Sequence, residues 1–163
     1  DTLEPYIQAA KVNGRGVFVL VKTSNPGSGD FQDMMVEEKA LFERIAEKLK
    51  PHSQNFEAPR TGWSSLGIVV GATYPAQAES LRELLPRTPF LIPGYGAQGG
   101  GADDAVRTFV KGPDGYEGGI VNSSRVILFP DKGNTDNPKE WEMAVSDAIK
   151  HAVDDLTEAL ARK

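Results

Sequence analysis

Four short apolar runs are the clearest feature of the chain. They occupy residues 16–21, 66–70, 89–93 and 119–121, and none of them alternates polar with apolar positions. Continuous runs of this length, rich in β-branched side chains, are typical of parallel strands covered on both faces. The pattern therefore predicts four buried strands of one parallel sheet.

Helical patterns lie between and around these runs. A first helix is predicted over residues 3–11, with Thr2 or Asp1 as its N-cap. Further helices are predicted over residues 31–50, ended by Pro51, and over residues 76–85 and 102–110. Residues 50–65 form the longest irregular stretch and are expected to be a surface loop.

The last predicted helix has the most regular pattern. Its apolar side chains recur at spacings of three and four with charges between them, so we expect them to pack in the core. They are Trp141, Val145, Ala148, Ile149, Ala152, Val153, Leu156 and Leu160.

The predicted order is α-β-α-β-α-β-α-β-α, which favours an α/β fold with a parallel sheet and right-handed crossovers. At 163 residues and 17.6 kDa the chain is one domain, residues 1–163. A complete (β/α)₈ barrel typically needs about 250 residues, so the chain is too short for one. No internal repeat or low-complexity tract occurs beyond this alternation.

Composition excludes several functional classes. Eighteen basic and twenty-three acidic side chains give a net charge of −5, which argues against a general nucleic-acid surface. The absence of cysteine excludes disulfides and thiolate sites and fits a reducing, cytoplasmic location. The apolar runs are too short to span a membrane. The chain begins at Asp1 without an initiator methionine, so we expect a processed product or a piece of a longer protein.

Candidate chemistry lies just after the predicted strands, because the carboxyl ends of parallel strands line the sites of such folds. All four following segments are small, hydroxyl-bearing or rich in glycine. They are residues 22–27, 71–73, 94–101 and 122–125.

The third of these segments matches G-x-G-x-x-G through Gly94, Gly96 and Gly99. One interpretation is a dinucleotide fingerprint with Asp114 as the ribose acid. A second is a phosphomonoester grip, in which Gln98 and a helix N-terminus near residue 102 assist the backbone. A third is a turn that binds nothing.

Arg125 follows the fourth strand and favours the phosphate interpretation, because a guanidinium binds phosphate in a bidentate manner. A surface ion pair is its alternative. Ser24 is either a ligand contact or a turn cap, and Thr73 is equally ambiguous. His52 and His151 are expected on the surface.

Asp103 and Asp104 are expected at a helix N-terminus. We find no spacing typical of a catalytic triad, a carboxylate pair or a metal site.

Three motifs carry a resemblance to a known family. They are Val-Val-Gly-Ala-Thr at residues 69–73, Pro-Gly-Tyr-Gly-Ala-Gln-Gly-Gly at 93–100 and Val-Asn-Ser-Ser-Arg at 121–125. In this order and spacing they closely resemble orotidine 5′-monophosphate decarboxylase. The segment Thr-Ser-Asn-Pro-Gly-Ser-Gly-Asp at 23–30 resembles the longer bacterial variety.

The resemblance implies a (β/α)₈ TIM barrel that converts orotidylate to UMP and CO₂ in pyrimidine synthesis, without metal or organic cofactor. It implies that Gln98 and Arg125 bind the 5′-phosphate, helped by backbone amides around Gly99 and Ser124. It also implies that Ser24 hydrogen-bonds the pyrimidine. The other pocket residues implied are Pro93 and Tyr95.

The chain departs from the family at its catalytic array, a D-x-K-x-x-D motif that does not occur here. Lys22, Lys111 and Lys132 have no aspartate partners at that spacing. The resemblance therefore implies the C-terminal half of the barrel, strands five to eight, which lacks catalytic residues of its own. Its implied partners are the substrate, the N-terminal half and, once complete, a second copy.

Two alternatives stay open. One is a non-catalytic half-barrel that binds phosphate or associates with itself, because half a barrel leaves sheet edges unpaired. The other is a different phosphosugar barrel enzyme that shares the glycine-rich grip.

Overall fold

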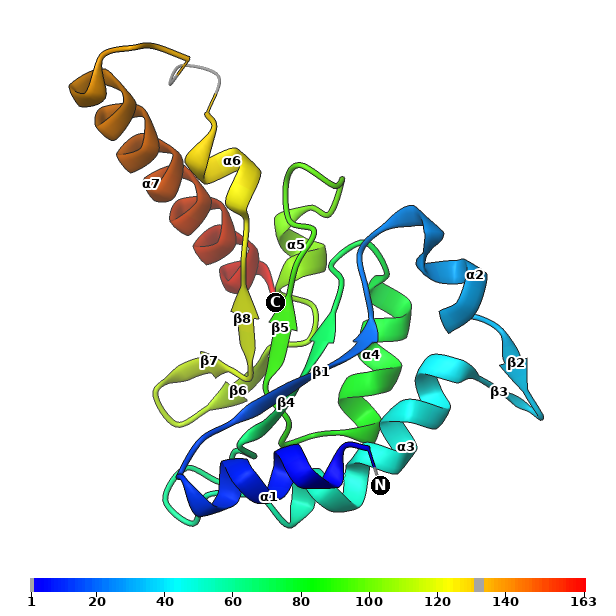
Figure 1. Ribbon diagram of the computed structural model, residues 1–163. Helices are drawn as coiled ribbons and strands as arrows, with labels where there is room; N and C mark the ends of the chain where they lie inside the picture. Colours follow the sequence, from blue (N-terminus) through cyan, green and yellow to red (C-terminus); the bar gives the residue numbers. More distant parts are fainter. Residues whose placement is uncertain (1, 131–133) are drawn as a thin grey trace.

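A parallel sheet of four strands organises the protein. The computed structural model describes residues 2–130 and 134–163. The strands β1 (Val17–Lys22), β4 (Leu66–Val70), β5 (Phe90–Ile92) and β8 (Gly119–Val121) lie in the order β1-β4-β5-β8, all parallel (Figure 1). This arrangement confirms the four predicted strands and the α/β class.

Helices follow the strands in the predicted alternation. The longer helices are α1 (Glu4–Val12), α3 (Leu41–Gln54), α4 (Pro75–Leu84) and α7 (Pro138–Arg162). Short helices are η1 (Pro26–Ser28), α2 (Gly29–Gln32), α5 (Ala102–Ala105) and α6 (Ser124–Leu128). Two small hairpins complete the described chain, β2 (Met35–Val36) with β3 (Lys39–Ala40), and β6 (Val110–Gly112) with β7 (Gly115–Glu117).

The two faces of the sheet differ in how they are covered. Ile68, Val70 and Phe90 are fully buried in the core together with residues of α3 and α4. On the other face, pairing of the strands places four residues in one row, namely Leu20, Val69, Leu91 and Ile120. At the two ends of this row Leu20 is 64% and Ile120 is 50% exposed, whereas Val69 between them is only 8% exposed, so this face is poorly covered at the outer strands.

The segment predicted as one helix over residues 31–50 is instead a hairpin followed by α3. Glu43 accepts a hydrogen bond from the amide of Ala40, which fixes the helix start at Leu41. The prediction that Pro51 ends the helix is wrong, because α3 continues to Gln54. A proline in the last turn removes only one internal hydrogen bond, so the helix tolerates it.

Two other boundary predictions are wrong. The helix predicted over residues 102–110 stops at Ala105, and the β6–β7 hairpin begins at Val110, with Gly115 at φ +135° as the first residue of β7. The N-cap of α1 is Leu3 without a side-chain hydrogen bond, in place of Thr2. Asp1, the other candidate, lies outside the described residues.

The surface loop predicted over residues 50–65 is shorter than expected. Its first five residues belong to α3, and Glu57 bridges to Ser64 within the remainder.

Helix α7 forms as predicted, but most of its apolar stripe is not in the core. Ala152 and Ala159 are the buried residues of the helix, whereas Trp141, Ile149 and Val153 are 42%, 46% and 55% exposed. The expected core packing is therefore wrong for much of the stripe. In the described chain no helix combines the length and apolar character needed to cross a bilayer.

A buried arginine connects the ends of several elements. The guanidinium of Arg82, on α4, donates at 2.7–3.1 Å to four backbone carbonyls, those of Leu85, Thr88, Thr108 and Gly118. It also stacks on the ring of Phe90, 3.8 Å from its centroid. Burial lowers the pKa of Arg82 to about 10, which leaves it charged at neutral pH. Because Gly118 directly precedes β8, this contact fixes where that strand begins.

We expect Arg82→Met to lower the free energy of unfolding by about 3 kcal/mol or more, because buried carbonyls lose their charged donor. Urea unfolding of the variant measures this loss. Arg87→Met is the matched control, since Arg87 is exposed in the neighbouring loop and its removal should change stability by less than about 0.5 kcal/mol. Equal losses in the two variants would contradict the role assigned to Arg82.

Candidate functional site

The carboxyl ends of the four parallel strands meet at one edge of the sheet, as the sequence predicted. Backbone hydrogen bonds continue past the strand ends: Gly71 donates to Lys22 at 2.7 Å and Ala72 donates to Pro93 at 2.8 Å. Asn122 donates to Ile92 at 3.2 Å. The four segments that follow the strands therefore lie side by side.

A recess of about 110 Å³ lies between the segments that follow β5 and β8. Of the predicted binding residues, five line it: Pro93, Tyr95, Gln98, Ser124 and Arg125. Ser24 and Gly99 are not among its lining residues. The structure thus brings together, from two separate loops, most of the side chains that the sequence singled out.

Of the described residues that line the recess, Arg125 is the one that carries a charge. It is exposed, and within the described chain its guanidinium makes no ion pair or hydrogen bond. The alternative of a surface ion pair is therefore not observed among these residues. Gln98 is also exposed, and its side-chain amide has no hydrogen-bond partner in the described residues. Both side chains are available to an anion.

The glycine-rich loop closes on itself by backbone hydrogen bonds. Gly94, Gly96 and Gly99 have φ values of +100°, +77° and +93°, which other residues rarely adopt. The amide of Gly99 donates to Gly96 at 2.8 Å, and that of Gly100 donates to Gly94 at 3.1 Å. A phosphate contact through the Gly99 amide would have to replace its present bond.

The predicted contribution of a helix N-terminus near residue 102 is small. Helix α5 is a single turn, and the amide of Gly101 already donates to Asp104 at 3.2 Å. Asp104 therefore caps this turn as predicted, whereas Asp103 pairs with Arg162 of α7 at 2.9 Å. Any anion in the recess depends on side chains more than on a helix dipole.

Ser24 lies beside the glycine loop at the end of β1. It is only 8% exposed, and no described residue hydrogen-bonds its hydroxyl. A side chain on Gly94 would come within 2.8 Å of its Cβ atom, so Ser24 is in direct contact with the loop that lines the recess. Its backbone carbonyl accepts a hydrogen bond from the Thr73 hydroxyl at 3.1 Å, which assigns the ambiguous Thr73 a structural bond.

Tyr95 lines the recess with its body while its hydroxyl is engaged elsewhere. The hydroxyl donates to Asp155 of α7 at 2.7 Å. Burial and the Asp155 carboxylate together raise the pKa of Tyr95 to about 12, so it keeps its proton at neutral pH. Tyr95 therefore anchors α7 to the site, a contact across 60 residues that no local motif indicates.

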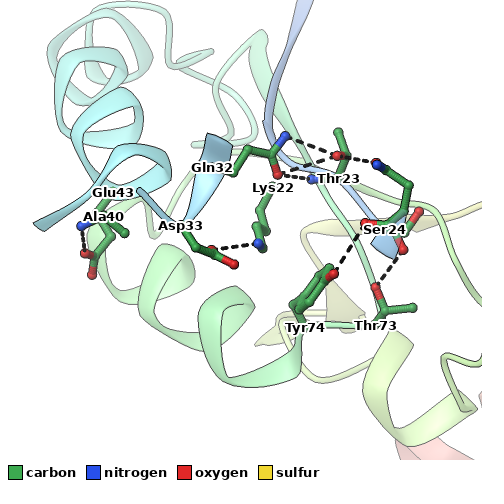
Figure 2. Close-up of polar contacts among 10 residues, drawn as sticks. Lys22, Thr23, Ser24, Gln32, Asp33, Ala40, Glu43, Thr73 and Tyr74 are labelled. Carbon is green, nitrogen blue, oxygen red and sulfur yellow. Dashed lines mark hydrogen bonds and ion pairs between the residues drawn. The ribbon is translucent and has the colours of Figure 1, made fainter. Parts of the chain in front are cut away.

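Lys22 has a partner that sequence spacing did not reveal. The side chain is fully buried, and its ammonium group lies 2.7 Å from the Asp33 carboxylate and 4.1 Å from the centroid of the Tyr74 ring (Figure 2). Asp33 follows the short helix α2, which the sequence analysis had merged into a longer helix. Lys111, by contrast, is exposed on β6, and Lys132 lies outside the described residues.

The dinucleotide interpretation loses its acid. Asp114 lies in the β6–β7 turn, just before β8 begins, and so at the amino end of the sheet. The glycine loop follows the carboxyl end of β5, which is the opposite edge. Asp114 therefore cannot bind a ribose held by that loop.

The two histidines differ in their distance from the recess, since His151 lines a neighbouring cavity of about 360 Å³ together with Tyr95 and Arg125. His52 is half-buried, 3.6 Å from Glu4, and His151 is exposed, as expected of surface residues.

Comparison with known proteins identifies one family. Residues 1–133 match the family described as "Orotidine 5′-phosphate decarboxylase / HUMPS family". The chain is similar to proteins named orotidine 5′-phosphate decarboxylase from Rhodopirellula baltica (39% identity, 98% of this chain, 52% of the relative) and from Clostridium perfringens strain SM101 (41%, 99% and 55%). The chain spans about half the length of these relatives.

Solved structures agree with this result. The fold is similar to that of Leishmania donovani OMP decarboxylase, with a TM-score of 0.70 at 26% identity, over 98% of this chain and 53% of the decarboxylase chain. L. donovani UMP synthase gives the same TM-score at 28% identity, over 98% of this chain and 31% of the synthase chain.

The contact between Gly94 and Ser24 predicts a difference between two glycines. Gly94→Ala and Gly99→Ala both strain the backbone, but a methyl group on Gly99 meets no atom within 4 Å. We expect Gly94→Ala to lower the free energy of unfolding by about 1–3 kcal/mol more than Gly99→Ala, because only the former also overpacks. Urea unfolding of both variants measures the difference, and equal losses would contradict the packing described.

Proposed function

This chain belongs to the orotidine 5′-phosphate decarboxylase / HUMPS family, and from this premise we propose that it forms the substrate-binding half of an orotidine 5′-phosphate decarboxylase. The reaction proposed is the conversion of orotidylate to UMP and CO₂. The observation that carries the proposal is the recess in which Arg125, unpaired in the described chain, meets Gln98 beside a glycine-rich loop.

The recess suits a phosphomonoester. A guanidinium can donate two parallel hydrogen bonds to a phosphate, and the side-chain amide of Gln98 can donate a third. The protein is acidic overall, so this local cation supplies the attraction that the net charge does not. We assign Gln98, Gly99, Ser124 and Arg125 to the 5′-phosphate.

The pyrimidine is assigned to the neighbouring strand ends. Ser24 is only 8% exposed as a residue, and its hydroxyl has no hydrogen-bond partner in the described residues, so it is available to a ligand. A polar edge of the pyrimidine ring would satisfy it. Pro93 and Tyr95 follow β5, which lies between β1 and β8 in the strand order, so they would line the space between Ser24 and Arg125.

We infer that the four strands are strands five to eight of a (β/α)₈ barrel, and that residues 1–163 form the C-terminal half of that single domain. Two features support this inference. In the described chain, strands β1 and β8 each have an unpaired edge, and the row that runs from Leu20 to Ile120 is exposed at both of its ends. An N-terminal half that adds four strands would pair both edges and bury this face as the barrel interior.

In this proposal the residues of the chain bind and orient, and the N-terminal half reacts. Cleavage of the bond between C6 and the carboxylate releases CO₂ and leaves an electron pair on C6, which a lysine of the D-x-K-x-x-D motif would protonate. That motif is absent from residues 1–163. Phosphate binding remote from C6 contributes binding energy that is used to stabilise the transition state. No metal or organic cofactor takes part in the proposed reaction.

The exposed face also favours a second candidate, a non-catalytic half-barrel that binds phosphate and associates with itself. A second copy could cover Leu20 and Ile120 as well as an N-terminal half could. The cytoplasmic location and the homodimer expected of the complete barrel remain predictions.

We expect residues 1–163 alone to show no measurable decarboxylation of orotidylate, because they lack the positioned charges that stabilise and protonate the carbanion. The loss of orotidylate absorbance measures the reaction. The protein for comparison is a fusion in which the N-terminal half of the C. perfringens relative precedes residues 1–163. We expect this fusion to decarboxylate orotidylate.

Activity of residues 1–163 alone would show that the catalytic centre is misplaced. A folded but inactive fusion would instead favour the non-catalytic half-barrel, which sedimentation of the unfused chain would reveal as a self-associating species.

In the same fusion we expect Arg125→Ala to weaken transition-state stabilisation by roughly 3 kcal/mol or more, because a charge-assisted bidentate contact is lost. Gln98→Ala should have a smaller effect of about 1–2 kcal/mol, since its amide is neutral. Steady-state values of kcat/KM measure both effects. Arg15→Ala is the control, because Arg15 is exposed just before β1 at the opposite edge of the sheet. An unchanged kcat/KM for Arg125→Ala would remove the phosphate assignment.

A further inference from the structure

Lys22 is an unusual residue to find in the core. Lysine is rarely fully buried, because removing its charge from water is unfavourable unless a partner compensates. Here the ammonium group lies between the rings of Phe42 and Tyr74, at 5.8 Å and 4.1 Å from their centroids, and it bonds to Asp33 at 2.7 Å. The pair is asymmetric, since Lys22 is fully buried while the Asp33 side chain is 41% exposed.

Stability alone does not account for this pair. Replacing a buried ion pair by apolar side chains of similar volume is often neutral or stabilising. A site bordered by two aromatic rings would accept an apolar side chain readily. What an apolar side chain cannot do is bind the Asp33 carboxylate, and so hold one point of the chain against another.

The two partners close a loop. Lys22 is the last residue of β1, and Asp33 follows α2, so their contact joins the two ends of residues 23–32. Two hydrogen bonds join the next residues inward, Thr23 and Gln32. The amide of Thr23 donates to the Gln32 side-chain carbonyl at 3.0 Å, and the Gln32 side-chain amide donates to the Thr23 hydroxyl at 3.1 Å (Figure 2). The Thr23 hydroxyl in turn donates to Asn25 at 2.7 Å.

Ser24 lies inside this closed loop. It is held from outside by Thr73, whose hydroxyl donates to its carbonyl (Figure 2). It is also in close contact with Gly71 and Gly94. The Tyr74 hydroxyl donates to the carbonyl of Asn25, the next residue, at 3.3 Å, while its ring covers Lys22. The buried ion pair and the backbone of Ser24, which carries the hydroxyl, are therefore connected by one network of contacts.

We propose that Lys22 is a positioning residue whose ion pair with Asp33 closes the loop of residues 23–32 and so holds the Ser24 hydroxyl at the ligand. The Lys22 ammonium group lies among Phe42, Tyr74 and Asp33, on the side of the sheet where α3 and α4 pack. It therefore acts through Ser24 and does not touch the substrate. This assignment deepens the proposed function and rests on it for the identity of the ligand. The closure of the loop itself does not depend on what the protein binds.

The first test needs no ligand. In Lys22→Met, amide hydrogen exchange of residues 23–32 should increase about tenfold or more, since the loop loses the contact that joins its ends. Lys39→Met is the matched control, because Lys39 forms an ion pair with Glu47 that is more exposed. Exchange that rises equally throughout the protein, or that does not rise in this loop, would overturn the proposal.

The second test asks whether Lys22 acts through Ser24. In the active fusion, Lys22→Met and Ser24→Ala should each lower kcat/KM about tenfold, and the double variant should be no worse than Ser24→Ala alone. Competitive inhibition by inorganic phosphate should keep the same inhibition constant in Lys22→Met, which a general loss of structure would not allow. Multiplicative losses in the double variant would overturn the positioning role.

The two outcomes can be separated from failure of the proposed function. An inactive unmodified fusion would contradict the decarboxylase assignment, and the exchange measurement would still decide whether Lys22 closes the loop.

Discussion

Parallel pairing is the constraint on which the site depends. Because β1, β4, β5 and β8 all run in one direction, their carboxyl ends must lie at one edge of the sheet, and the residues that follow them must become neighbours. Segments separated by as many as 100 residues thus contribute to one place. The recess between the loops after β5 and β8 follows from hydrogen bonding between backbones, before any side chain is considered.

Two buried cations adjust this frame at opposite edges. Arg82 binds the carbonyl of Gly118 and so fixes the amino end of β8, the strand that leads to Arg125. Lys22 binds Asp33 and so fixes the chain that leaves the carboxyl end of β1. Backbone carbonyls satisfy the arginine and a carboxylate satisfies the lysine, which suits a planar fork of donors and a compact point charge, respectively.

Sequence patterns predicted what short-range physics determines. The four strands and the convergence of their following loops could be predicted, because apolar runs and strand direction determine them. Of the recess residues, Gln98 and Arg125 could be predicted from their chemistry, whereas Pro93, Tyr95 and Ser124 were implied only by the resemblance to a known family. The helix start at Leu41 could not be predicted, because the apolar pattern continues upstream of it. A hydrogen bond from the Ala40 amide to the Glu43 carboxylate determines where the helix begins. The Lys22–Asp33 and Tyr95–Asp155 contacts bring together residues 11 and 60 positions apart, and only the tertiary fold determines them. The exposed stripe of α7 was misjudged because periodicity reports an apolar face without reporting what covers it.

Leu20 and Ile120 are exposed at the two ends of their row, and each lies on a strand whose outer edge is unpaired in the described chain. This arrangement affects how the protein must be handled. An unpaired edge can pair with a strand of a neighbouring chain, so at high concentration the protein can aggregate irreversibly as well as pair correctly. The amount of folded protein recovered from a cell therefore depends on the rate of correct strand pairing relative to the rate of aggregation. Production together with a chain that fits those edges should therefore increase recovery without altering a single residue.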